Sequence, residues 1–217
     1  MNTNELKALA TISAGAPLLA QVGHSADANS VQELVANIQS SDDSIRGPAW
    51  QNAATAGAPA VKPLAGLMTH ADFEVARSAK RALYKIVRHA GRPGASKEAK
   101  AVTAELIALL KDQPTVVRRE ALWMLSAIGG KEAINPMAAL LSDAEAREDA
   151  RCALMRLPWK EVTSVFRTEF KNAPEEFRFA LAGSLRQRGE KVEGYPSQKL
   201  TPTKQTTVKP TEPKPAK

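Results

Sequence analysis

Few residues of this chain are suited to catalysis or metal binding. Its 217 residues include one cysteine, Cys152, and three histidines, His24, His70 and His89. One cysteine cannot form an internal disulfide. The histidines do not pair at metal-ligand spacing and no HExxH motif occurs, so the sequence predicts no metal site. We therefore expect a protein that is not an enzyme and that uses no cofactor.

Two further catalytic signatures are missing. The chain has no Gly-x-Ser-x-Gly elbow, and segment 91–97, GRPGASK, lacks both the spacing and the preceding strand of a phosphate-binding loop. We interpret that segment as a flexible insertion between helices. Cys152 is not accompanied by a histidine, so we interpret it as a buried or tolerated thiol and not as a nucleophile.

Long apolar runs are also absent. No stretch of 18 or more apolar residues occurs, so the sequence predicts no membrane span. Residues 1–30 have two interpretations. Lys7 precedes a modest apolar run, and Ala26-Asp27-Ala28 resembles a signal-peptidase site, which would indicate export. Glu5 and the polar residues within the run favour instead a capping helix and loop of a cytoplasmic protein, and this is our prediction.

The composition is that of a globular chain whose apolar residues are mainly Ala and Leu. Hydrophobic residues make up 43%, charged residues 24% and aromatic residues only 5%, which suits closely packed helices. The net charge is +7, but residues 190–217 hold six lysines and three glutamates, which leaves +4 for the rest. That mild excess is compatible with nucleic acid or acidic protein partners and requires neither.

Residues 190–217 differ in composition from the rest of the chain. They are rich in Lys, Thr and Pro and end in TPTKQTTVKPTEPKPAK. Such a segment has almost nothing to bury, so burial cannot offset the entropy lost on ordering. We predict a disordered C-terminal tail.

A pattern of apolar residues recurs five times between residues 31 and 189. Counted from an Arg position, Ala or Leu follows after three and after seven residues. The Arg positions are Arg46, Ala76, Arg118, Arg147 and Arg178. In four of the five units a second set of apolar residues lies eight and twelve residues earlier, and in the slightly shorter fourth unit Met137 and Leu141 take these places; each set has the i, i+4 spacing of an amphipathic helix. The predicted helix pairs span residues 31–57, 58–90, 95–129, 130–157 and 158–189.

Turn residues agree with these pairs. Asp42, Asp72 and Asp143 lie four residues before their Arg positions, where an N-cap or first-turn acid is favoured. Pro114 and Pro174 occupy the same place in the third and fifth pairs, and a first-turn proline loses no helix hydrogen bond. Self-similarity at this spacing indicates a repeat architecture.

This pattern resembles the HEAT-repeat family, particularly its short bacterial form of roughly thirty residues per repeat. The resemblance implies an all-α, right-handed α-solenoid of about five helical hairpins, with the second helix of each pair lining the concave face. It also implies a ladder of hydrogen bonds between the turn acids and the arginines of neighbouring pairs. The sequence departs from the family pattern at one Arg position, Ala76, and at two acid positions, Pro114 and Pro174. These departures weaken the implied ladder. Family members that hydroxylate a lysine-derived residue use His-Glu pairs, which this chain lacks.

Cationic and aromatic residues of the second helices form the candidate partner-binding surface. Positions one, five, and eight or nine residues beyond the Arg position are expected to point away from the core. The candidates are Arg77, Arg81, Tyr84, Lys85, Arg119, Trp123, Arg151 and Arg186. We expect Trp123 to be exposed beside arginines, as an interface anchor or a platform for stacking bases, and Trp50 to be half packed. The plainer alternative is that Trp123 covers the groove floor and the arginines are solvated.

These observations favour a non-catalytic scaffold that binds a protein partner, specifically an acidic segment, through its concave face. The alternative is a nucleic-acid-binding protein, because some HEAT-like solenoids resemble DNA glycosylases that hold duplex in a basic groove. A third interpretation, an accessory subunit related to HEAT-containing bilin lyases, rests on the fold alone.

Overall fold

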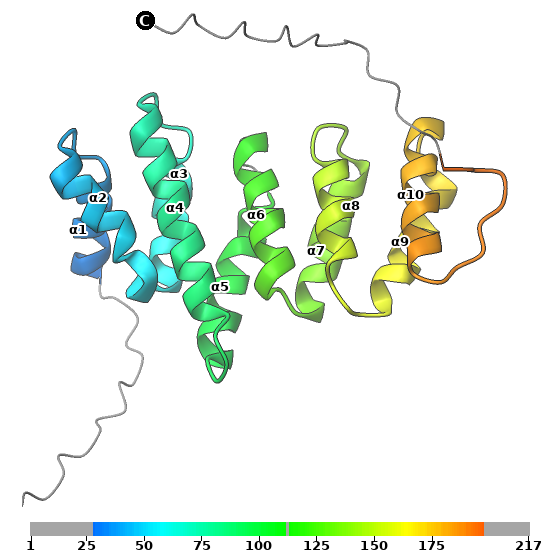
Figure 1. Cartoon of the computed structure of the whole chain (residues 1–217), viewed down its shortest axis with the longest axis horizontal. Helices are drawn as coiled ribbons and strands as arrows, with labels where there is room; N and C mark the ends of the chain where they lie inside the picture. Colours follow the sequence, from blue (N-terminus) through cyan, green and yellow to red (C-terminus); the bar gives the residue numbers. More distant parts are fainter. Residues whose placement is uncertain (1–27, 112, 198–217) are drawn as a thin grey trace, which may run out of the picture.

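A computed structural model describes residues 28–111 and 113–197, and every regular element within these residues is helical (Figure 1). The α-helices are α1 (Ala28–Ile38), α2 (Asp43–Gln51), α3 (Val61–Leu67), α4 (Phe73–Ala90), α5 (Ser96–Ala108), α6 (Thr115–Ile128), α7 (Ile134–Ala138), α8 (Arg147–Met155), α9 (Glu161–Asn172) and α10 (Glu175–Gln187). Short 3-10 helices lie at Ala53–Ala56, Ala58–Ala60, Lys131–Ala133 and Ala139–Ser142. The all-α prediction is confirmed. Of the predicted N-terminal segment 1–30, capping helix or signal peptide, residues 1–27 lie outside the described residues, and residues 28–30, predicted as loop, form the first turn of α1.

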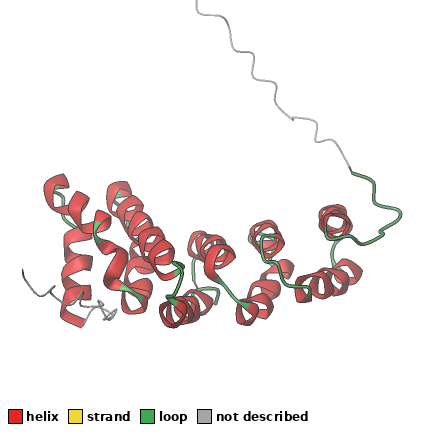
Figure 2. Ribbon diagram, turned by 60° about the horizontal axis from the view of Figure 1, so that its bottom comes forward, coloured by secondary structure: helices red, strands yellow, loops and turns green. Residues whose placement is uncertain are grey.

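The helices follow one another in pairs along the long axis of the molecule (Figure 1). The second helices of the pairs, α2, α4, α6, α8 and α10, form one layer and the first helices form another (Figure 2). Within the layer of second helices, α4 contacts both α2 and α6, and α8 contacts both α6 and α10. Each pair is thus held mainly by its neighbours in sequence.

One continuous apolar core lies between the two layers. The Ala and Leu positions of the repeated pattern are at its centre: Ala79 and Leu83 of α4, Leu125 of α6 and Leu154 of α8 are all buried. Two helices cannot bury all of their own apolar surface, so each pair contributes one side of an interface with the next pair. The regular spacing of small and large apolar residues therefore sets both the helix pairs and their packing.

Polar contacts between neighbouring pairs are uneven. Arg118 forms an ion pair with Asp143 of the next pair, and this hydrogen-bonded guanidinium lowers the pKa of the Asp143 carboxyl. Arg147 bonds Glu176 of the following pair at 3.1 Å. Arg46 instead pairs with Asp43 of its own helix. Among the described residues, Arg118 and Arg147 therefore bond an acid of the next pair whereas Arg46 does not, and Glu176 provides the acid in the fifth pair, where Pro174 cannot.

Residues 190–197 have no helix or strand but contact the last pair. The Tyr195 ring lies edge-on to Phe170 and Phe179, with centroids 5.0 and 5.2 Å away. Glu190 accepts two hydrogen bonds from Arg167, at 2.9 and 2.6 Å. The part of the predicted tail that the structure describes is therefore attached to α9 and α10. Residues 198–217 lie outside the described residues.

Tyr195→Ala is expected to lower the free energy of unfolding by about 0.5–1.5 kcal/mol, because both aromatic contacts are lost. Deletion of residues 196–217 is the matched control and should leave the melting temperature unchanged, because it keeps Tyr195. Thermal unfolding followed by circular dichroism measures both. Equal melting temperatures for Tyr195→Ala and wild type would show that the ring contacts of Tyr195 do not stabilise the last pair.

Candidate partner-binding groove

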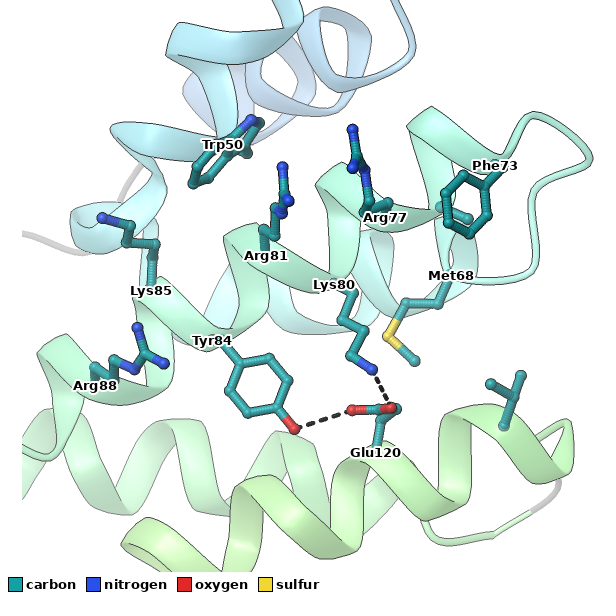
Figure 3. A pocket seen from close by; sticks show the side chains of 12 residues that line it. Trp50, Met68, Phe73, Arg77, Lys80, Arg81, Tyr84, Lys85, Arg88 and Glu120 are labelled. Carbon is teal, nitrogen blue, oxygen red and sulfur yellow. Dashed lines mark hydrogen bonds and ion pairs between the residues drawn. The ribbon is translucent and has the colours of Figure 1, made fainter. Parts of the chain in front are cut away.

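A groove of about 660 Å³ runs over α4, between α2 and α6 (Figure 3). It brings together four of the predicted binding residues, Arg77, Arg81, Tyr84 and Lys85. They are joined there by Trp50 of α2 and by Val116 and Glu120 of α6. We refer to this feature as the α4 groove.

The sequence of α4 explains why these side chains share one face. The helix begins at Asp72, whose carboxylate accepts hydrogen bonds from the backbone N–H groups of Glu74, at 2.8 Å, and Val75, at 3.4 Å. Its small and apolar residues face the core at helical spacing. Eight of the other residues form two i, i+4 rows that line the groove, namely Phe73, Arg77, Arg81 and Lys85, and Ala76, Lys80, Tyr84 and Arg88.

Apolar side chains are exposed at one end of the groove. Phe73, the first residue of α4, is 71% exposed, and Val116 of α6 is 48% exposed. Met68, at the end of α3, lies beside Phe73 (Figure 3). A contiguous exposed apolar surface is characteristic of binding sites. Phe73 and Val116 therefore mark this end of the groove as a place where a partner can bury apolar surface.

A polar network joins α4 to α6 in the middle of the groove. The Glu120 carboxylate forms an ion pair with Lys80 and accepts a hydrogen bond of 2.9 Å from the Tyr84 hydroxyl. Burial, and then the negative charge of Glu120, raise the pKa of Tyr84 well above its usual value. Tyr84 therefore remains a neutral donor at physiological pH. This network fixes the floor of the groove.

Three cations of the groove have no carboxylate partner among the residues described. These are Arg81, Lys85 and Arg88, which extend from the middle of α4 to its last turn, and we refer to this stretch as the second half of α4. The Arg81 guanidinium lies 5.0 Å from the centre of the Trp50 ring, a cation–π distance. By contrast, Arg77 pairs with Glu74. The second half of α4 thus presents net positive charge to the solvent.

The other four predicted binding residues lie outside this groove. The Trp123 side chain is half-buried and not exposed as predicted, because its indole N–H donates a 2.9 Å hydrogen bond to Asp149 of the next pair. Arg119 bonds the same carboxylate at 2.6 Å. Arg151 pairs with Glu148 of its own helix and donates a 2.7 Å hydrogen bond to Ser184 of α10, and Arg186 bonds the backbone carbonyl of Val192. These four residues therefore connect structural elements to one another. The indole ring that lines the groove belongs to Trp50 and not to Trp123.

The described residues show neither a metal-binding cluster nor a membrane-spanning helix. In residues 28–111 and 113–197, no cluster of His, Cys, Asp and Glu is arranged to hold a metal ion. No helix within the same ranges has the length and apolar character needed to cross a membrane. Cys152 is half-buried, and burial raises the pKa of its thiol, which keeps the sulfur in its poorly nucleophilic form.

No protein-family model and no curated protein sequence matches this chain. Among solved structures, the chain is similar to the crystal structure of an engineered protein from the Northeast Structural Genomics Consortium. The two share 21% sequence identity with a TM-score of 0.37, over 76% of this chain and 83% of the other.

Proposed function

We propose that this protein is a non-catalytic HEAT-like repeat scaffold, an α-solenoid whose second helices line its concave face. It binds an acidic segment of a protein partner in the α4 groove. One observation carries the proposal: exposed Phe73 and Val116 line the same groove as the uncompensated Arg81, Lys85 and Arg88. Apolar contact provides affinity there, and the cations select for negative charge.

The distribution of charge favours a protein partner over nucleic acid. Duplex DNA is bound through many phosphate contacts along an extended cationic surface. On the second helices beyond α4, arginines are largely neutralised by acids, as in the pairs of Arg119 with Asp149 and Arg147 with Glu176. Among the described residues of the second helices, cations without a carboxylate partner are concentrated from Arg81 to Arg88 of α4, in the same groove as exposed apolar side chains. That combination fits a short acidic protein segment better than a polyphosphate backbone.

Affinity purification with charge-reversed variants tests this proposal. Arg81→Glu removes a groove cation, and Lys62→Glu is the matched control, because Lys62 is exposed on α3 in the other layer. Partners that bind in the groove should be recovered, after nuclease treatment, with the wild type and Lys62→Glu but not with Arg81→Glu. Circular dichroism confirms that all three proteins are folded.

Two outcomes would contradict the proposal. Equal recovery of partners by all three proteins would place binding outside the α4 groove. Alternatively, DNA or RNA that binds the purified protein with an affinity falling steeply as salt rises, and that is lost in Arg81→Glu, would identify nucleic acid as the ligand.

A further inference from the structure

The α4 groove has two chemically different halves. Phe73 and Met68 lie at the first turns of α4, whereas Arg81, Lys85 and Arg88 lie further along the helix (Figure 3). Val116 of α6, one helical turn before Glu120, lines the same groove. The rise of about 1.5 Å per helical residue places Phe73 about 12 Å along the axis from Arg81 and about 18 Å from Lys85. A ligand that contacts both halves must therefore separate its apolar and charged groups by a similar distance.

The charges within the groove reinforce this division. The two cations nearest the apolar half, Arg77 and Lys80, are neutralised by Glu74 and Glu120. The three cations of the second half are uncompensated among the residues described. A carboxylate placed over the apolar half would therefore approach two acids whose cations are already engaged. The same carboxylate over Arg81, Lys85 and Arg88 would meet three cations that have no carboxylate partner among the residues described. This arrangement repels a ligand carboxylate that lies over the apolar half and attracts one that lies over the second half.

We propose that the α4 groove recognises a two-part motif in which bulky apolar residues and a cluster of carboxylates are segregated along the chain. This inference rests on the proposed function and deepens it. An extended peptide advances about 3.3 Å per residue, so about four to six residues separate the apolar residues from the acids. The apolar part lies over Phe73 and Val116, and the acids lie over Arg81, Lys85 and Arg88. Glu120 is the specificity-determining residue, because it opposes acids next to the apolar part.

Two synthetic peptides of identical composition test the segregation. In the first, fluorescein-labelled Leu-Phe-Leu is joined through Gly-Ser-Gly-Ser to three aspartates. In the second, the three aspartates alternate with the apolar residues and the spacer follows. Fluorescence anisotropy with the full chain should give a Kd about tenfold lower for the segregated peptide, since three solvent-exposed ion pairs each contribute a fraction of a kcal/mol. Equal Kd values, or no binding of either peptide, would overturn the inference.

Glu120→Gln separates specificity from affinity. A glutamine keeps a hydrogen-bond acceptor for Tyr84 and frees Lys80, so the variant should bind the alternating peptide more tightly and reduce the ratio of the two Kd values severalfold. Lys62→Glu should leave both Kd values unchanged. An unchanged ratio in Glu120→Gln would rule out its role in specificity. If Arg81→Glu loses the partners recovered by affinity purification but the two peptides bind with equal Kd, the proposed function is retained and only the two-part motif is rejected.

Discussion

Leu125→Ala is expected to lower the free energy of unfolding by about 2–5 kcal/mol. The Leu125 side chain is 0% exposed in α6, the second helix of the central pair. Because α6 contacts α4, α5 and α8, the cavity would open where three helix pairs meet. The surrounding residues are held by several helices and cannot readily collapse into it. The loss therefore includes both the transfer of the missing methyl and methylene groups and the cost of the cavity.

Urea denaturation monitored by circular dichroism measures this effect. Val116→Ala is the control, since it truncates an apolar side chain of the same helix that is 48% exposed, and it should cost less than about 1 kcal/mol. A loss below that value for Leu125→Ala would mean that α6 does not lie in a shared core.

Asp149→Ala is expected to lower the free energy of unfolding by about 1–3 kcal/mol. The Asp149 side chain is 14% exposed and accepts hydrogen bonds from Arg119, at 2.6 Å, and from the Trp123 indole, at 2.9 Å. Without it, the half-buried indole N–H has no acceptor, and a contact between the third and fourth helix pairs is lost. The cost comes mainly from the unsatisfied donor.

A double-mutant cycle isolates that contribution. Trp123→Phe keeps an aromatic ring but removes the N–H, so Asp149→Ala should cost about 1 kcal/mol less in that background than in the wild type. Glu132→Ala, at an exposed carboxylate of the same region, should change stability little. An identical cost of Asp149→Ala in both backgrounds would show that the indole bond does not connect the two pairs.

The helical fold is well predicted from sequence because its information is local and repeated. Ala79, Leu83, Leu125 and Leu154 occupy equivalent places in the pattern, and all are buried. Asp72 and Asp143 precede their helices and accept backbone hydrogen bonds as expected. Residues 190–197 are less predictable. Their composition predicts disorder, but the Tyr195 ring packs against two aromatic rings of the last pair. No local sequence pattern indicates that long-range contact.

The candidate site is only half predictable because exposure depends on the neighbouring pair. Position within the helix predicts that Arg81 and Trp123 both face outward. Trp123 is nevertheless covered, because Asp149, 26 residues later in the chain, provides its acceptor. Phe73 was missed as a binding residue because it lies at the start of α4, before the repeated pattern defines inward and outward faces. Its position directly after the N-cap Asp72 is the signal that could have identified it.

The central claim is that partners bind in the α4 groove, and site-specific photo-crosslinking tests it most directly. A photoreactive amino acid replaces Arg77, a groove residue whose charge is already neutralised by Glu74, or Lys62 on α3. Illumination of the complex with a recovered partner, followed by mass spectrometry of the adduct, identifies the contacting segment. We predict an adduct from position 77, and none from position 62, with a partner segment in which apolar residues are followed or preceded by a cluster of acids. Adducts from position 62 alone would contradict the account.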